Sequence, residues 1–273
     1  RLVRFSAPQG IRGIQIHTKE GMKMFRCKNL FDNPNMKQIA ASGNVKVFEY
    51  QRDLSVTPQT AIAAYYASEM NLRQRQVLIE LNGTPWILQA GAMQWIGGNI
   101  QMGSGVKGVG DFLGKAISAK VTKESVAKPE YNGYGLLMLE PTYKHILLMN
   151  VEEWGGLVLE DGLFLACDGR IKQNIVARSN LSSAALGGEG LFNLCLSGSG
   201  LAVLESPVPM EELIIFEVEN DEIKIDGNMA IAWSNSLQFT VERSSKSLLG
   251  SAVSGEGLVN VFRGTGKILM SPL

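Results

Sequence analysis

Histidine is scarce in this chain of 273 residues, and the only two, His17 and His145, lie 128 positions apart (145 − 17). A metal-binding β-roll usually brings two or three histidines and a carboxylate to one ion, so the sequence predicts no metal site. No Gly-x-Ser-x-Gly turn is present to support a catalytic serine. We therefore expect a protein that is not an enzyme, with no catalytic residues and no cofactor.

Cysteine is also sparse. The three cysteines, Cys27, Cys167 and Cys195, are odd in number, widely spaced and set in apolar runs. This usage is typical of buried free thiols in a reducing compartment. We expect a cytoplasmic protein.

The chain has no excess charge and no long apolar run. Lysine plus arginine and aspartate plus glutamate both number 26, so no overall field attracts RNA or an anionic membrane, and a nucleic-acid partner is not expected. No apolar stretch approaches the roughly 18 residues that cross a bilayer, and residues 1–5 are not followed by the apolar core of a secretory signal. We expect a soluble protein.

Two glycine-rich segments resemble phosphate-binding loops, but neither meets the full requirements of such a loop. Residues 103–108 fit the string G-x-G-x-x-G, but that string binds a dinucleotide only between a strand and a helix of a parallel unit. Residues 108–115 place five residues rather than four between their glycines, and Ala116 stands where a P-loop needs serine or threonine. Neither segment predicts a nucleotide site.

What the chain does have is glycine in repeated turns. Asx-Gly pairs end at Gly83, Gly162 and Gly227, and each lies between two apolar strand patterns. Such a pair supplies the positive φ angles of a two-residue hairpin, so each predicts a hairpin that opens one copy of a repeat.

A Gly-Glu-Gly-Leu motif, followed by an apolar residue and asparagine, recurs in a second hairpin predicted for two of the copies. We interpret it as a structural signature made of Gly188, Glu189, Gly190 and Asn193 in the second copy and of Gly255, Glu256, Gly257 and Asn260 in the third. A Gly-Ser/Thr-Gly turn and a Ser-Pro pair follow in both. The first copy has a weaker match at Gly133 and Gly135. Glu189 and Glu256 could instead form an acid–base couple, but a glutamate between glycines is more simply a turn or bulge residue.

These repeats predict an all-β protein: a β-sandwich with double-stranded β-helix-like repeats, three copies around a pseudo-threefold axis, and one or two short helices. The repeats are expected at 76–151, 156–207 and 222–273 within one compact unit. Residues 1–75 would add β-hairpins and a short helix that starts with Thr57 as its N-cap and Pro58 at its first position and continues into 61–67.

The first repeat is longer than the others, which predicts an insertion at about 97–125. Part of it has the apolar spacing of an amphipathic helix, and these positions are the candidate contact with a partner or a membrane: Val109, Phe112, Leu113, Ala116 and Ile117. The simpler hypothesis is a helix or lid that docks on the protein's own sheet. A membrane surface is the alternative that we do not favour.

The strings that begin at Asp226, Gly255 and Gly264 resemble the "altered inheritance of mitochondria, twenty-four" family, and residues 89–97 and the second copy extend the similarity over most of 76–273. The resemblance implies the fold of the trp RNA-binding attenuation protein, tripled within one chain. It supplies no catalytic residues, because most bacterial members are uncharacterised and the yeast member is tied to mitochondrial inner-membrane organisation.

Three hypotheses of function follow. The leading one is a non-enzymatic scaffold or binding module that has a protein partner or forms a homo-oligomer. The second is RNA binding, which rests on the analogy of fold alone. The third is small-molecule binding in a groove between strands.

Overall fold

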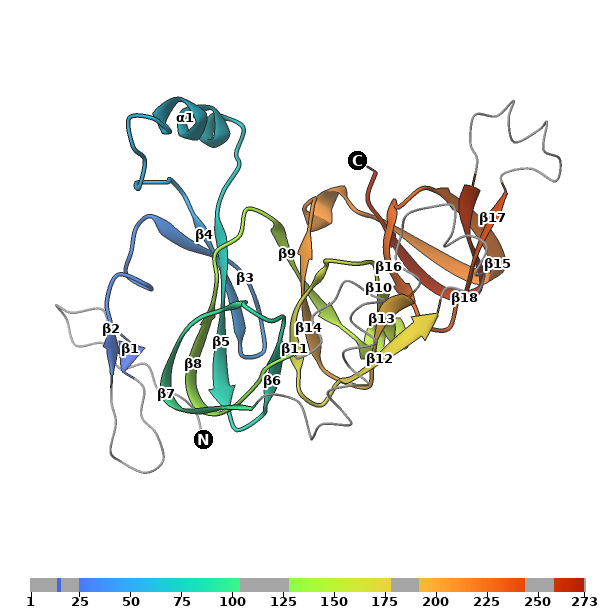
Figure 1. Ribbon diagram of the computed structural model, residues 1–273, viewed down its shortest axis with the longest axis horizontal. Helices are drawn as coiled ribbons and strands as arrows, with labels where there is room; N and C mark the ends of the chain where they lie inside the picture. The colour runs from blue at the N-terminus through green and yellow to red at the C-terminus, as the bar shows by residue number, and fades with distance from the viewer. Residues whose placement is uncertain (1–13, 16–24, 104–127, 178–191, 244–257, 273) are drawn as a thin grey trace.

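The computed structural model describes residues 14–15, 25–103, 128–177, 192–243 and 258–272, and they form a mostly β protein (Figure 1). They contain the α-helix α1 (Ala61–Glu69) and two short 3-10 helices, η1 (Glu152–Trp154) and η2 (Met210–Glu212). The predicted all-β class is therefore confirmed.

The larger sheet has nine strands, which come from residues 36–206. Along its hydrogen-bonded path it contains, in order, β3 (Met36–Ser42), β4 (Val45–Tyr50), β5 (Arg75–Asn82), β8 (Glu130–Leu139), β6 (Trp86–Leu88), β11 (Phe164–Asp168), β14 (Leu201–Ser206) and β9 (His145–Asn150), while β7 (Met93–Gly103) pairs with β8 off this path. Every neighbouring pair is antiparallel. The path ends at two edge strands, β3 and β9.

The second sheet has seven strands and belongs to the later part of the chain. Its path contains β12 (Lys172–Ala177), β13 (Phe192–Ser197), β10 (Leu157–Leu159), β16 (Ala230–Ser234), β18 (Leu258–Met270) and β15 (Ile214–Asp226), with β17 (Gln238–Arg243) paired to β18. Two further short strands, β1 (Ile14–Gln15) and β2 (Arg26–Cys27), pair with each other.

Three apolar clusters explain this arrangement of layers. The nine-stranded sheet curls around one of them, in which Ile79 and Leu137 of the paired strands β5 and β8 meet Val203 of β14, which lies further along the path. The other sheet curls around an aromatic group of Trp233, Phe239 and Phe262. A third cluster contains side chains of both sheets: from the larger sheet Leu147 and Leu204, and from the smaller one Leu157, Leu159 and Leu196. The two sheets therefore pack against each other as a sandwich.

The Asx-Gly turns are present, but they are corners rather than hairpins. The glycines have positive φ, at +98° for Gly83, +82° for Gly162 and +51° for Gly227. The two strands that each turn joins do not pair with each other: β5 pairs with β4 and β8, for example, whereas β6 pairs with β8 and β11. The hairpin prediction was wrong because local turn chemistry specifies a reversal of the chain and not the partner of the strand that follows.

The second predicted hairpin is absent from both copies. The glycines at 198 and 200 separate β13 from β14, which lie in different sheets, and Gly264 and Gly266 lie inside the continuous strand β18. The hairpins observed are instead β3–β4, and the pairs β7–β8, β12–β13 and β17–β18.

Strand pairing is alike in the second and third repeats. In the second, β13 pairs with β10 and β12, and β14 pairs with β11. In the third, the first half of β18 pairs with β15 and β17, and its second half pairs with β16. The first repeat shares the pairs β5–β8 and β7–β8, but its last strand β9 pairs with β14 instead of β6. The pseudo-threefold axis stays a prediction.

The glycines in the weak signature of the first repeat are required by close strand contact. An added Cβ on Gly133 would stand 2.1 Å from the carbonyl oxygen of Asn99, and one on Gly135 would stand 2.1 Å from that of Gly97. These contacts lie in the β7–β8 hairpin, which includes residues 97–103 of the predicted insertion. The rest of the predicted insertion, 104–125, lies outside the described residues.

The helix begins later than its sequence signals suggest. Thr57 and Thr60 close a turn, in which the Thr57 N–H donates to Thr60 Oγ1 at 3.0 Å and the Thr60 N–H donates to the Thr57 carbonyl at 3.1 Å. This turn uses the capping groups that were expected to start the helix at Pro58, and α1 starts at Ala61 instead. No residue of α1 is buried.

Candidate binding groove

The two edge strands of the nine-stranded sheet line a common groove. Its volume is about 680 Å³. It is lined by residues 39–42 of β3, residues 145–149 of β9, Pro209, Met210 and Glu211 at η2, and Glu49, Asn71 and Arg75 at one end. Figure 1 shows β3 and β9 side by side near the centre of the molecule. The curled sheet is therefore like a barrel that is not closed between β3 and β9, and the groove lies between these two strands.

Among the strands that the structure describes, β9 pairs only with β14, and its other backbone edge faces the groove. Val151 N–H donates to the Gly200 carbonyl at 3.1 Å, so it points toward the β14 side. Glu205, which lies opposite Ile146, points its own N–H away from β9, to the Leu163 carbonyl at 2.7 Å. Because N–H direction alternates along an antiparallel ladder, the peptide groups of Ile146 and Leu148 face away from β14, toward the free edge.

The end of the groove next to η2 is acidic. The Arg75 guanidinium is held by Glu49 at 2.9 Å and donates to the Tyr143 carbonyl at 3.4 Å, so its charge is already paired. Glu211 forms no ion pair with any residue that the structure describes. Burial, followed by the charge of Arg75, lowers the pKa of His145, against the opposite effect of the nearby glutamates. At neutral pH this end therefore carries net negative charge.

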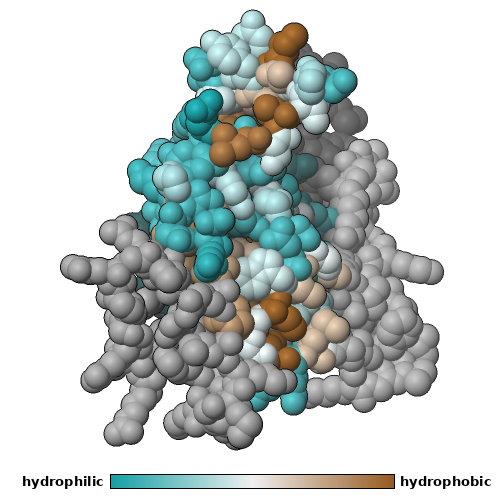
Figure 2. Space-filling model, turned by 90° about the vertical axis from the view of Figure 1, so that its left-hand side faces the viewer, coloured by the Kyte–Doolittle hydropathy of each residue, from teal (hydrophilic) through white to brown (hydrophobic). Residues whose placement is uncertain are grey.

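The segment 51–74, which joins β4 to β5, forms an arm that projects from the sheet and carries α1 at its tip (Figure 1). Its apolar side chains are exposed, for example Ile62 at 74% and Met70 at 81%. Figure 2 shows apolar surface around α1 at the top of the molecule. Asn71, at the base of this arm, also lines the groove.

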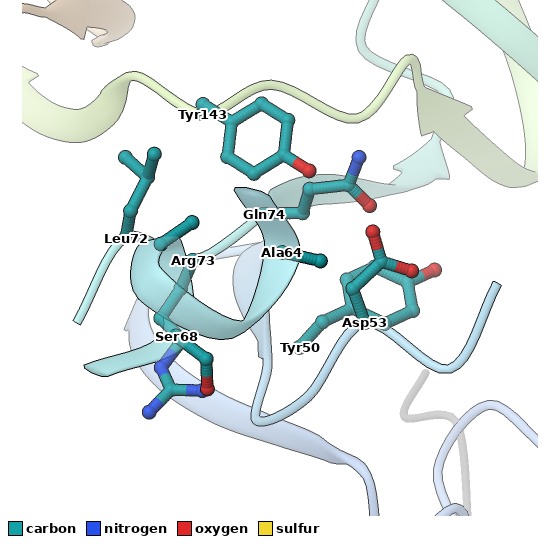
Figure 3. A pocket seen from close by; sticks show the side chains of 9 residues that line it. Tyr50, Asp53, Ala64, Ser68, Leu72, Arg73, Gln74 and Tyr143 are labelled. Atoms are coloured by element: carbon teal, nitrogen blue, oxygen red, sulfur yellow. The ribbon is translucent and has the colours of Figure 1, made fainter. Parts of the chain in front are cut away.

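A small cavity of about 50 Å³ lies beneath α1 (Figure 3). Tyr50, Asp53, Gln74 and Tyr143 are among its lining residues. Arg73 fixes the arm above it by donating to the carbonyl of Gln51 and to Ser68 Oγ. A cavity of this size holds about one or two water molecules, so it is not a ligand site.

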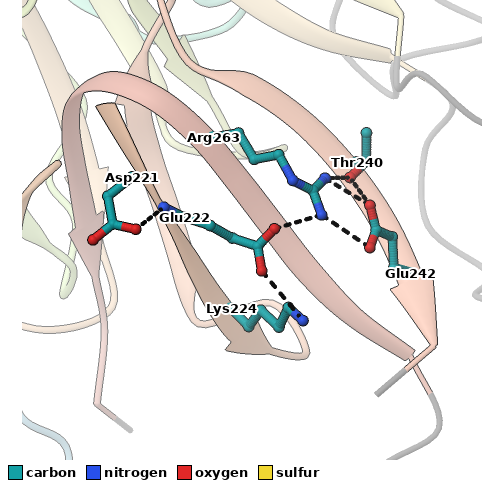
Figure 4. A network of polar contacts seen from close by, with 6 residues as sticks. All are labelled: Asp221, Glu222, Lys224, Thr240, Glu242 and Arg263. Carbon is teal, nitrogen blue, oxygen red and sulfur yellow. Dashed lines mark hydrogen bonds and ion pairs between the residues drawn. The ribbon is translucent and has the colours of Figure 1, made fainter. Parts of the chain in front are cut away.

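A polar network on the smaller sheet is structural (Figure 4). Arg263 of β18 contacts Glu222 of β15 at 2.6 Å and Glu242 of β17 at 2.6 and 3.1 Å, and also donates to Thr240. The hydrogen bonds from Arg263 and then Thr240 lower the pKa of Glu242 to about 2. The network joins three adjacent strands, and neither of the two cavities described above includes any of its members.

The described part of the chain assembles no reactive thiol or metal cluster. All three cysteines are free. Cys167 and Cys195 are buried as predicted, whereas Cys27 is only half-buried. Burial raises the pKa of Cys167 to about 12 and also raises that of Cys195. In these same ranges, no three metal-binding side chains gather, and no helix is long and apolar enough to cross a membrane.

Two of the predicted signature residues are described, and both have structural roles. Asn193 donates to the Leu159 carbonyl at 2.9 Å, and Asn260 donates to the Gly227 carbonyl at 2.7 Å. Each ties the fourth strand of its repeat to the segment at the Asx-Gly corner. The other candidates lie outside the described residues: Gly188, Glu189, Gly190, Gly255, Glu256, Gly257, Val109, Phe112, Leu113, Ala116 and Ile117.

Fold and site together define a β-rich protein with two curled sheets and an open groove. Within that class, the chain belongs to the family described as mitochondrial biogenesis AIM24, whose model matches residues 68–273. The resemblance found in the sequence is thus confirmed, whereas the likeness to the trp RNA-binding attenuation protein stays a prediction.

Two bacterial proteins are similar to this chain. An uncharacterised protein of Streptococcus pyogenes serotype M6 is 30% identical over 194 residues, which is 68% of this chain and 76% of that protein. A crystal structure of a Streptococcus pyogenes protein superposes with a TM-score of 0.53 and 27% identity, covering 74% of this chain and 89% of the other. The names of both proteins assign no activity.

Proposed function

We propose that the chain is a non-enzymatic binding module, or scaffold, which holds a polypeptide segment of a partner protein in the groove between β3 and β9. The observation that carries the proposal is that two free strand edges line one groove of about 680 Å³. Natural proteins usually cover or disrupt exposed strand edges, because such edges pair readily with other chains. The free thiols support a reducing compartment such as the cytoplasm.

The chemistry of the groove favours a polypeptide over RNA. No lysine lines it, its arginine is paired with Glu49, and Glu49 and Glu211 are carboxylates that would repel phosphate. The volume lies in the range of small-molecule sites, about 300–1,000 Å³, but the backbone of β9 offers repeated peptide groups rather than a few convergent polar ones. A homo-oligomer would require a second copy to supply the segment.

The test is selection of binding sequences from a displayed library of random octapeptides, followed by affinity measurement with Ile39→Arg and Ile175→Arg. The two isoleucines are matched, since both are on edge strands and are 44% and 42% exposed. Only Ile39 lines the groove. We expect Ile39→Arg to weaken binding at least about tenfold and Ile175→Arg to leave it unchanged, as follows from blocking one site.

Other results would contradict the proposal. Failure to select any peptide, or equal binding by Ile39→Arg and the unmodified chain, would remove the groove as the site. Peptides whose binding is lost in Ile62→Arg but retained in Ile39→Arg would place the site on α1. Sedimentation at the same concentrations identifies a second copy as the occupant if the chain self-associates and Ile39→Arg does not.

A further inference from the structure

Resting on the proposed function, we infer that the partner segment binds as an added β-strand, antiparallel to β9, with apolar side chains at alternate positions and a lysine or arginine near its C-terminal end. Three observations support this inference. They are the direction of the strands, the residues of β9 whose N–H and C=O groups face the groove, and the charge at one end of the groove.

The first step concerns strand direction. Seven successive antiparallel pairings connect β3 to β9, so these two strands run in opposite directions. One strand added between them must be antiparallel to one edge and parallel to the other. The register of β3 with β4 shifts between Gln38 and Ala40, whereas β9 pairs with β14 without a break. The regular edge, β9, is thus the better template, and antiparallel pairing is slightly the more stable.

The second step concerns the ladder. Ile146 and Leu148 each turn a peptide N–H and C=O toward the groove, as shown above, and could form paired hydrogen bonds with an incoming backbone. The five lining residues of β9 span about 17 Å at about 3.4 Å per residue. An added strand of about five residues fills this length. Apolar groups around it, such as Ile39 and Met210, favour apolar side chains on the alternate residues that face inward.

The third step concerns charge. Glu211 lines the groove at the end where β9 begins, close to His145. A strand antiparallel to β9 has its C-terminal end there. With Arg75 neutralised by Glu49, the uncompensated charge at this end is negative, and it complements a basic residue of the partner.

The experiment uses the octapeptide selected above, amidated at its C-terminus, and measures its affinity by fluorescence anisotropy. Leu148→Pro removes an outward N–H, and an outward edge position tolerates proline without loss of the β9–β14 ladder. Its matched control, Leu148→Ala, shortens the side chain but keeps the N–H. We expect Leu148→Pro to bind at least about tenfold more weakly than Leu148→Ala, with thermal unfolding used to verify that both variants are folded.

Two further arms need no change to the strand. Two methylated peptides are compared, one N-methylated at the alternate amides that would face β9 and one at the amides between them. We expect the first peptide to lose binding and the second to bind only slightly more weakly than the unmodified peptide. A lysine-to-glutamate exchange near the peptide's C-terminus should cost about two- to fivefold, as for an exposed ion pair. Glu211→Lys should reverse that preference, whereas Glu219→Lys, at an exposed position of β15 that does not line the groove, should not.

The outcomes separate the two proposals. Equal affinities for Leu148→Pro and Leu148→Ala, together with equal binding of the two methylated peptides, would overturn strand addition while leaving the groove supported by Ile39→Arg. An unchanged charge preference in Glu211→Lys would overturn the predicted orientation. If Ile39→Arg bound the peptide as tightly as the unmodified chain does, both proposals would be overturned.

Discussion

At the residue scale, the two described residues of the repeat signature, Asn193 and Asn260, have a structural role. Asn193 and Asn260 are both buried, and each donates its side-chain amide to a carbonyl near an Asx-Gly corner. A corner between strands that do not pair leaves backbone carbonyls without ladder partners, and a buried carbonyl needs a donor. The asparagine provides one, which accounts for its recurrence in both repeats.

We expect Asn193→Ala to destabilise the fold by about 1–3 kcal/mol, because it leaves the buried Leu159 carbonyl unsatisfied. Asn260→Ala should cost about 0.5–1.5 kcal/mol, because Gly227 is exposed and water can reach its carbonyl. The measurement is the free energy of unfolding in urea. Lys172→Ala, on the edge strand β12, is a control for which we expect a change within about 0.5 kcal/mol. If both asparagine variants were as stable as this control, the signature would not have the structural role assigned here.

At the element scale, the sequence predicted the strands better than their partners. The positive φ of Gly83, Gly162 and Gly227 follows from local chemistry, and it was predicted correctly. The destination of each following strand depends on contacts distant in sequence, so corners were mistaken for hairpins. For the same reason the groove was not predicted: residues 146–149 are a short apolar run in the sequence, and only the order of the described strands shows that one edge of β9 is free.

The network around Arg263 connects β15, β17 and β18, and the stability that it contributes should depend on pH. Its hydrogen bonds hold the pKa of Glu242 at about 2, below its ordinary value of 4.5. The stabilisation from this carboxylate is therefore complete above about pH 4.5 and is lost as the pH falls toward 2. We expect the difference in unfolding free energy between the unmodified chain and Glu242→Gln to be small but measurable at pH 7, since the group is exposed, and to vanish near pH 2.

The control for this pH series is Glu217→Gln. Glu217 is on β15 and forms a longer contact with Lys267, at 3.5 Å. Its substitution should give a difference that scarcely changes between pH 7 and pH 2, since a loose exposed pair contributes little. A Glu242→Gln difference that stayed constant across the same range would show that Arg263 does not hold this carboxylate.

At the scale of the whole molecule, the two sheets share one apolar cluster in addition to the cluster inside each curl. Leu147 and Leu204 of the nine-stranded sheet meet Leu157 and Leu159 of the seven-stranded sheet in it. The strands of the second repeat are divided between the sheets, with β11 and β14 in the larger and β10, β12 and β13 in the smaller. Neither sheet can therefore separate without exposing core side chains of the other.

This shared core predicts cooperative unfolding. Leu159→Ala should destabilise the protein by about 2–5 kcal/mol, the usual cost of a large-to-small change in a core. Although Leu159 is in the smaller sheet, hydrogen exchange followed by mass spectrometry should show an equal loss of protection in β5 of the larger sheet and β18 of the smaller. Ile215→Ala, at a side chain that is 45% exposed on β15, should change neither. Loss of protection in β18 with β5 unaffected would mean that the sheets unfold separately, and that the shared cluster does not couple them.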